Sequence, residues 1–150
     1  MNLIDILTPD CIELAVDEKS KKRVLERLGV LISTHGELDE QLVFDSLVDR
    51  ERLGSTGIGN GVAIPHGRIA DLMHPVGAFI QLHKGINFDA VDKQPVDLVF
   101  GLIVPQSTTH EHSELLNSLV QQCNNAAWRA ALREAKDKTT ILQLMRTNLQ

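Results

Sequence analysis

The segment from Gly54 to Gly67 restricts the local fold more than any other part of this chain. It reads GSTGIGNGVAIPHG, so a glycine-rich loop leads into a short apolar run and one histidine. Glycines permit a positive φ and leave backbone N–H groups open to an anion. Pro65 fixes its own φ and favours an extended Ile64. We therefore expect a strand over Val62–Pro65 with His66 held rigidly at its end, an arrangement that a phosphoryl-accepting histidine requires.

Simpler interpretations of the same segment stay open at this point. A cluster of Gly, Ser, Thr and Asn usually marks only a loop, and a lone histidine usually has no catalytic role. A Walker loop is excluded because no Gly-Lys-Ser/Thr follows the glycines. A dinucleotide fingerprint follows a strand and opens a helix, whereas this loop follows a helical pattern and opens a strand. The spacing alone leaves phosphate handling by His66 and an ordinary loop as alternatives.

Size, charge and cysteine content narrow the class of protein. The 150 residues suit one domain over 1–150 with a real hydrophobic core. A net charge of −5 and few aromatic residues argue against a nucleic-acid partner. Cys11 and Cys123 form no metal or redox spacing, which favours reduced thiols in the cytosol. The N-terminus does not read as a signal peptide, and no apolar run is long enough to cross a bilayer. We expect a cytoplasmic protein without membrane insertion.

Two helical patterns precede the glycine loop. Asp17 is the expected N-cap of a helix that Gly36 stops, and Asp39 is the expected N-cap of a second helix. The first is expected to bury Val24, Leu25, Leu28, Leu31 and Ile32, and the second Leu42, Val43, Leu47 and Val48. Four cations crowd the start of the first helix, namely Lys19, Lys21, Lys22 and Arg23. They read either as a solvated face or as a docking patch for a partner.

Strand and helix patterns alternate in the remainder of the chain. Strands are expected at Val62–Pro65, Val76–His83 and Val96–Val104, with a turn or loop over Asn87–Gln94. Thr109 is the expected cap of a helix through Leu115, Leu116, Leu119 and Val120. Two shorter helices are expected at Ala126–Ala135 and Thr139–Thr147. Strands interleaved with helices predict an α/β layered domain.

A second group of polar residues, Thr108-Thr109-His110-Glu111-His112, lies where a strand gives way to a helix. Anions bind at such positions in α/β folds. The two histidines could ligate a metal together with His66, but no nearby acidic or cysteine ligand completes a convincing site, so no metal is expected. The alternative is that one histidine caps the helix and the other faces solvent.

Several segments of the sequence resemble a known protein family. STGIGNGVAIPHGR, residues 55–68, is similar to the phosphorylation-site signature of phosphotransferase-system (PTS) enzyme IIA domains of the fructose/mannitol type, also called EIIA type 2. The segment Phe88–Phe100, Val104-Pro105 and the downstream histidine resemble later landmarks of that family. SKKRVLE, residues 20–26, is similar to the nitrogen-regulatory branch. Lys93 departs from the pattern, because many relatives carry a small residue there.

The resemblance implies both a fold and a set of site residues. The implied fold is an α/β single-domain three-layer sandwich in which a mixed β-sheet is flanked by helices. His66 would be the phosphoryl acceptor, carrying the phosphate on the tele nitrogen, Nε2. His112, downstream of Val104-Pro105, would be the second active-site histidine, and Arg50 would be the active-site arginine. His110 is not carried over, and no cofactor or metal is implied.

Transfer between two protein histidines places defined demands on the site. It needs positioning and stabilisation of the charge spread over the phosphoryl oxygens. Arg50, His112 and the N–H groups of the glycine loop are suitable donors. The expected phosphate-binding residues are Ser55, Thr56, Gly57, Gly59, Asn60 and Gly61. An apolar rim that includes Ile58, Val62 and Phe88 is expected to surround His66 and limit hydrolysis.

Three functional hypotheses follow. The first is a regulatory phosphocarrier of the nitrogen-related PTS, a phosphoprotein and not a turnover enzyme on a small molecule. It would take phosphate from an HPr-like protein (NPr) and control targets such as potassium-transport or sensor-kinase proteins. The second is a sugar-specific IIA component that relays phosphate to a IIB domain. The third, from another class, is a non-catalytic anion- or metal-binding module, which predicts no covalent phosphate on His66.

Overall fold

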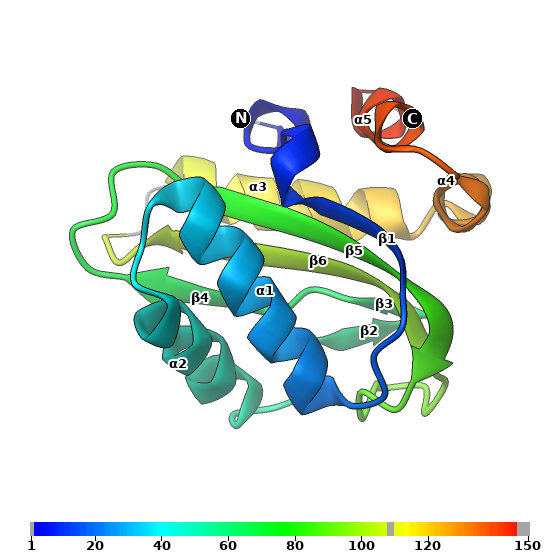
Figure 1. Cartoon of the computed structure of the whole chain (residues 1–150), viewed down its shortest axis with the longest axis horizontal. Coiled ribbons are helices and arrows are strands. Elements are labelled where there is room, and N and C mark those ends of the chain that lie inside the picture. Colours follow the sequence, from blue (N-terminus) through cyan, green and yellow to red (C-terminus); the bar gives the residue numbers. More distant parts are fainter. Residues whose placement is uncertain (1, 108–109, 147–150) are drawn as a thin grey trace.

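A mixed six-stranded sheet forms the centre of the molecule (Figure 1). The computed structural model describes residues 2–107 and 110–146, and for residues 110–112 it describes the backbone only. The strand order is β1-β5-β6-β3-β2, and β4 also pairs with β6. The strands are β1 (Ile12–Val16), β2 (Gly57–Gly59), β3 (Val62–Ala63), β4 (His66–Ile69), β5 (Val76–Ile86) and β6 (Val96–Pro105). β5 runs antiparallel to β6, whereas β3 and β4 both run parallel to it.

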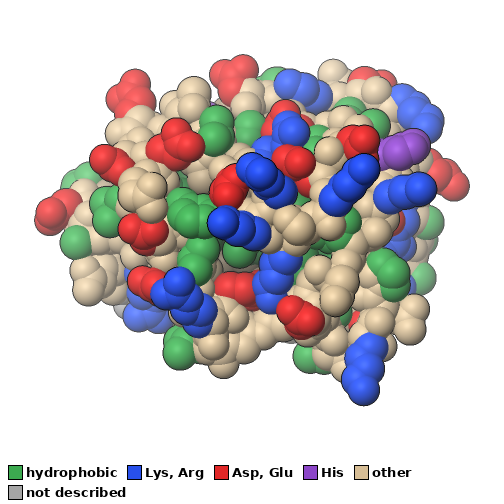
Figure 2. Space-filling view, turned by 60° about the horizontal axis from the view of Figure 1, so that its bottom comes forward, with side chains coloured by type: hydrophobic (Ala, Val, Ile, Leu, Met, Phe, Trp, Pro, Cys, Tyr) green, Lys and Arg blue, Asp and Glu red, His purple; other side chains and the backbone are tan. Residues whose placement is uncertain are grey.

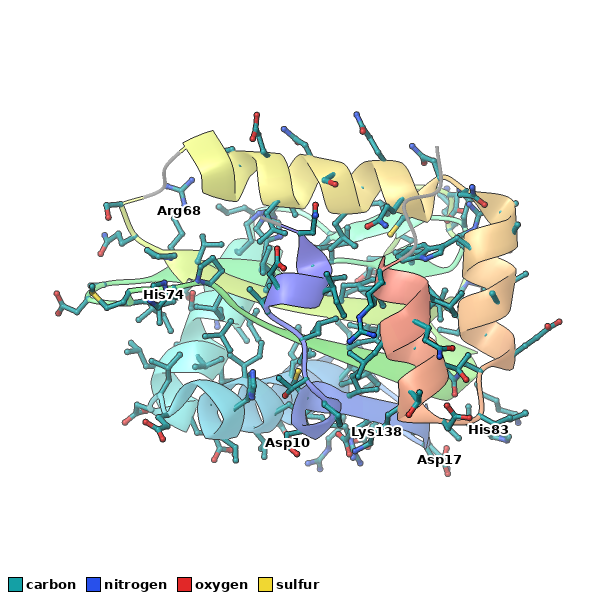
Figure 3. The ribbon with its side chains drawn as sticks, turned by 90° about the horizontal axis from the view of Figure 1, so that it is seen from above. Asp10, Asp17, Arg68, His74, His83 and Lys138 are labelled. Carbon is teal, nitrogen blue, oxygen red and sulfur yellow. The ribbon has the colours of Figure 1, made fainter. Side chains whose placement is uncertain are left out.

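Helices cover both faces of this sheet (Figures 1 and 3). One layer holds α1 (Lys21–Gly36) and α2 (Glu40–Glu51), and the other holds α3 (His110–Cys123) and α4 (Ala126–Glu134). Helix α5 (Lys138–Arg146) packs against β1 and the two short 3-10 helices, η1 (Leu3–Asp5) and η2 (Pro9–Cys11). This arrangement confirms the expected α/β fold with a mixed sheet between helices. None of the described helices is long and apolar enough to span a membrane.

The starts of the first two helices test the capping predictions. The prediction for Asp17 was wrong, because Ser20 is the N-cap of α1 and its side chain accepts a hydrogen bond from the Arg23 N–H at 3.2 Å. The prediction for Asp39 is confirmed, since its carboxylate accepts from the Leu42 N–H at 3.0 Å. The Leu42 side chain itself is 51% exposed, so its expected inward position was also wrong.

The glycine loop departs most from the expectation. Only Val62–Ala63 of the expected strand pairs as β3, and it forms a hairpin with β2. This hairpin was not predicted, because the glycine-rich sequence of β2 is typical of a loop. Asn60 and Gly61 connect the two strands with φ values of 58° and 80°. Two consecutive positive φ angles at Asn-Gly are the signature of a tight hairpin turn. The strands β1, β2 and β4 were not predicted, while β5 and β6 are confirmed and run slightly longer than expected.

The three helices expected in the C-terminal part are confirmed within the described residues. Asn125 caps α4 by accepting from the Trp128 N–H at 2.9 Å. α5 starts one residue earlier than expected, at Lys138. The proposed cap Thr109 and the expected last helical residue Thr147 lie outside the described residues. The loop over 87–94 is also confirmed.

The core packs closely on both sides of β6, the strand that supports the segment containing His66. The ring of Phe100 lies 4.9 Å from Phe79 and stacks on Trp128 at 5.8 Å between centroids. At Gly101 an added Cβ would lie 2.7 Å from a methyl group of Leu28, so α1 packs directly on the backbone of β6. The parallel strands β3 and β4 are therefore bonded to a strand that is fixed from both sides.

Candidate functional site

His66 is the first residue of β4, and its backbone is fixed by the neighbouring strand. It lies opposite Leu102 of β6, and the Leu102 N–H donates to the Pro65 carbonyl at 3.0 Å. The sequence predicted a histidine at the end of a strand. The structure instead places it at the start of β4, and both β4 and the preceding strand β3 pair with β6. The backbone at His66 is held as expected, but by pairing with β6 both before the histidine, through β3, and after it, through β4.

The imidazole of His66 is oriented by one backbone hydrogen bond. Its Nδ1 lies 2.8 Å from the carbonyl oxygen of Ile64. A carbonyl can only accept, so Nδ1 carries the proton and donates it, which leaves a lone pair on Nε2. The half-buried ring lines a surface cavity. Nε2 is therefore the nitrogen available for attack on an electrophile.

The surroundings of His66 favour the neutral ring. Burial lowers the pKa of His66 below its ordinary value of 6.5, and the positive charges of Arg50 and Arg68 lower it further. The Ile64 carbonyl and the Glu51 carboxylate oppose these effects. A neutral imidazole keeps the Nε2 lone pair free at neutral pH, as a nucleophile requires.

Arg50 reaches the same cavity from the last turn of α2. A guanidinium N–H of Arg50 donates to the Gly54 carbonyl at 3.0 Å, which holds the side chain at the helix end. A cation there also interacts favourably with the negative end of the helix dipole. Helix α2 lies directly against β4, because a Cβ added at Gly67 would collide with Ser46. The structure thus brings Arg50 and His66 to one cavity, as the family resemblance implied.

The cavity has a volume of about 490 Å³ and lies along β4, between α2 and α3. Its apolar lining residues are Leu53, Leu102, Val104 and Leu116, and its polar ones include Ser46, Asp49, Arg50, His66, Arg68 and Ser113. The expected rim of Ile58, Val62 and Phe88 was wrong, since none of these lines the cavity and the last two are fully buried. Arg68 was absent from the predicted site residues, although it follows His66 by two positions in a strand.

The predicted phosphate-binding residues do not line this cavity, and several of their polar groups already have partners. The Thr56 N–H donates to the Glu51 carboxylate at 2.8 Å, and the Gly57 N–H donates to the Ser55 hydroxyl at 3.0 Å. The Asn60 N–H donates to Asp92 at 2.9 Å. Gly59 and Gly61 shape the hairpin through positive φ values of 102° and 80°. In this structure the glycine loop builds the β2–β3 hairpin, and none of its predicted phosphate-binding residues lines the cavity that contains His66.

A polar cluster around Glu51 connects this hairpin to the helices. The buried Glu51 carboxylate accepts from the Thr56 hydroxyl at 2.6 Å and lies 3.7 Å from the Lys21 ammonium. Lys21 also lies 3.6 Å from Asp89 and 5.0 Å from the centre of the Phe88 ring. Lys21 therefore has a structural role, unlike the exposed Lys19 and Lys22. On the face that carries α2 and the start of α1, cationic and acidic side chains are mixed (Figure 2).

His112 and His110 belong to the first turn of α3, and their side chains lie outside the described residues. Ser113 and Leu116, which follow in the same helix, line the cavity. The start of α3 therefore borders the same cavity as His66, and the assignment of His112 stays a prediction. Within the described residues, no three His, Cys, Asp or Glu side chains are grouped as metal ligands would be.

Known proteins resemble this chain in both sequence and structure. A family model described as phosphoenolpyruvate-dependent sugar phosphotransferase system, EIIA 2, matches residues 5–148. The nitrogen regulatory protein of Pseudomonas aeruginosa is 42% identical over 146 residues, which cover 97% of this chain and 95% of that protein.

Two solved structures share the fold. That of the nitrogen regulatory protein IIA-Ntr from Neisseria meningitidis matches with a TM-score of 0.91 and 38% identity, covering 95% of this chain and 98% of the other. The IIA mannitol structure from Escherichia coli matches with a TM-score of 0.79 at 22% identity, covering 93% of this chain and 98% of the other, and so shows a common fold alone. These similarities confirm the family resemblance carried by residues 55–68 and its nitrogen-regulatory branch.

Proposed function

Since this chain belongs to the EIIA type 2 family of the phosphoenolpyruvate-dependent sugar phosphotransferase system, we propose that it is a regulatory phosphocarrier. Its acceptor atom is Nε2 of His66. The observation that carries this proposal is the orientation of the ring, in which Nδ1 donates to the Ile64 carbonyl and Nε2 keeps its lone pair. The ring lines a cavity that also receives Arg50 and Arg68.

The phosphoryl transfer from the donor histidine to His66 needs no additional acid or base. The lone pair of Nε2 attacks the phosphorus of a phosphohistidine on the donor protein, and a new N–P bond forms. The N–P bond of the donor breaks, and its electron pair returns to the donor nitrogen. If the second ring nitrogen of the donor carries a proton, the donor leaves as a neutral imidazole. The His66 ring becomes cationic, and its Nδ1–H remains bonded to the Ile64 carbonyl.

The site contributes mainly positioning and charge stabilisation. The phosphoryl group passes through a loose transition state whose charge is spread over its three oxygens. A guanidinium fixed at the end of α2 can donate two parallel hydrogen bonds to such oxygens. We assign this role to Arg50. A similar role for His112 is consistent with the position of α3 at the cavity but rests on the family resemblance.

An HPr-like phosphocarrier (NPr) is the proposed donor. Leu53 is 84% exposed beside the cavity, and with the half-buried Leu116 it offers an apolar contact for a docking protein. Such a contact excludes water from the phosphoryl group during transfer. The chain is 42% identical to a nitrogen regulatory protein and 32% identical to the fructose-specific EIIA component of Haloferax volcanii. This difference favours regulation of target proteins over relay to a IIB domain.

Phosphorylation is proposed to act as a switch on target binding. A phosphoryl group adds close to two negative charges beside the exposed Leu53. A target that packs on Leu53 would then bury part of this charge, which is costly without a partner. At least one target, which the family resemblance suggests is a potassium-transport or sensor-kinase protein, should therefore prefer the unphosphorylated form. A pull-down with free and enzymatically phosphorylated protein tests this, and equal capture by both forms would favour a simple phosphate relay.

Covalent phosphorylation is tested by intact mass under alkaline conditions. The protein is incubated with phosphoenolpyruvate, enzyme I and an HPr-type carrier. We expect one phosphate on the wild type and none on His66→Ala. His83→Ala is a matched control, because His83 is exposed on β5 and does not line the cavity. An unphosphorylated wild type would support the non-catalytic binding module instead.

A further inference from the structure

Arg68 is a cation beside His66 whose charge has no partner among the side chains that the structure describes. Its guanidinium takes part in no described hydrogen bond or ion pair, and only its backbone carbonyl is engaged, accepting from the Ser46 hydroxyl at 3.0 Å. The neighbouring cations differ in this respect. Arg50 donates to Gly54, and Arg52 lies 3.5 Å from Asp49. With respect to the described side chains, Arg68 therefore keeps its guanidinium donors available for a ligand.

The backbone places Arg68 on the same cavity as His66. Residues at i and i+2 of a strand point to the same side, and both His66 and Arg68 line the cavity. The strand between them is fixed, because His66 lies opposite Leu102 and Arg68 opposite Val104 in the parallel pairing with β6. In Figure 3 the Arg68 side chain extends from the sheet toward the layer that holds α3. Arg50 approaches the cavity from α2, in the opposite layer.

The charge balance of the cavity indicates what this arrangement fits. The phosphoryl group on a histidine carries close to two negative charges, whereas Arg50 supplies one positive charge and has one N–H occupied by Gly54. Asp49 also lines the cavity, and its carboxylate is paired with Arg52 at 3.5 Å. The glycine-loop donors do not line the cavity, and several already have partners. A second guanidinium would complete the contacts to the phosphoryl oxygens, because its planar fork matches a pair of such oxygens.

We propose that Arg68 binds the phosphoryl group on Nε2 of His66 as a second cation, opposite Arg50. This inference rests on the proposed phosphorylation of His66. Arg68 takes no part in bond making and moves no proton. It holds the non-bridging oxygens during transfer and in the phosphorylated product.

The test compares three variants: Arg68→Gln, Arg68→Lys and the control Arg52→Gln. Arg52 is also exposed, lies near the cavity and does not line it. The rate of phosphorylation by the HPr-type carrier is measured for each. We expect Arg68→Gln to be slower by about tenfold or more, less than the roughly 10²–10³-fold cost of losing an enclosed donor, because Arg68 is exposed to water. Arg68→Lys should restore part of the rate through its charge, and Arg52→Gln should match the wild type.

A second measurement separates contact with the phosphate from a structural role. The isolated phosphoproteins are followed during hydrolysis at fixed pH, and the His66 ring is titrated by NMR in the free proteins. We expect Arg68→Gln to change the hydrolysis rate and to raise the pKa of His66, because a neighbouring positive charge is lost. Arg68→Gln behaving like Arg52→Gln in transfer, hydrolysis and titration would overturn this inference alone. A wild type that acquires no phosphate would overturn the proposed function itself.

Discussion

Replacing Glu51 with alanine should destabilise the junction between α2 and the β2–β3 hairpin. The Glu51 side chain is only 6% exposed, and it accepts from the Thr56 N–H at 2.8 Å and the Thr56 hydroxyl at 2.6 Å. Thr56 is itself 4% exposed, so water cannot readily replace the lost carboxylate. The variant leaves two buried donors without an acceptor.

The expected magnitude follows from these two donors. Each buried donor without a partner costs about 1–3 kcal/mol. The hydroxyl can rotate toward another acceptor, so we expect a total loss of about 3 kcal/mol in the free energy of unfolding. For a chain of this size that corresponds to a fall in melting temperature of about 6–12 °C. Lys21 contributes less to the loss, since it keeps Asp89 as a partner at 3.6 Å.

Thermal and urea unfolding of Glu51→Ala, with Glu26→Ala as control, provide the assay. Glu26 pairs with Arg23 at 3.2 Å on the surface of α1, and losing an exposed pair should cost less than about 0.5 kcal/mol. A double-mutant cycle with Thr56→Val should give a coupling energy of about 1 kcal/mol or more. A loss in Glu51→Ala as small as that of the control, or strict additivity with Thr56→Val, would refute the role of this contact.

Three further predictions concern the cavity. Arg50→Gln and His112→Ala should fold normally but accept phosphate more slowly, because the barrier to phosphoryl transfer rises by up to about 2.7–4 kcal/mol. Transfer rates equal to that of the wild type in both variants would show that these residues are structural only. The lowered pKa of His66 means that the unfolded chain binds more protons than the folded one between the ordinary value of 6.5 and the folded value. The free energy of unfolding should therefore fall as the pH drops through this window, and His66→Gln should lose less of it than the wild type. Urea unfolding of both proteins at several pH values measures this. An equal dependence on pH in the two proteins would contradict the lowered pKa of His66. Leu53→Asp should raise the KM for the HPr-type donor by about five- to tenfold with little change in kcat, whereas Met73→Asp, at an equally exposed position outside the cavity, should not; identical KM values would exclude docking at Leu53.

Local chemistry explains which parts of the fold the sequence could predict. Asp39 is followed by a regular apolar period, so its helix and cap are confirmed, and the long apolar runs of β5 and β6 are unambiguous. The error at Asp17 arose because Asp17 and Ser20 are both favoured N-cap residues, and it is the Ser20 side chain that accepts from the Arg23 N–H. The Asn60-Gly61 pair is another overlooked local signal, since this dipeptide favours the turn of a two-residue hairpin.

Only part of the candidate site could be predicted from the sequence, and its geometry could not. His66 and Arg50 are brought to one cavity, as the family resemblance implied. The direct role assigned to the glycine loop depended on assuming that adjacent segments share one site. Glu51, Ser55 and Asp92 hold that loop through contacts that the sequence does not reveal. Arg68 could have been found from strand alternation, had residues 66–69 been read as a strand.

The most direct test of the account is the position of the phosphate on the His66 ring. The protein, labelled with ¹⁵N at histidine, is phosphorylated by the HPr-type carrier, and the ring nitrogen bonded to phosphorus is identified by its ³¹P coupling in NMR spectra. We predict coupling to Nε2 of His66, with Nδ1 still protonated and bonded to the Ile64 carbonyl. Phosphorus coupling to Nδ1 of His66 would contradict the claim that Nε2 is the acceptor. Coupling to a histidine that is still seen in His66→Ala would contradict the claim that His66 carries the phosphate.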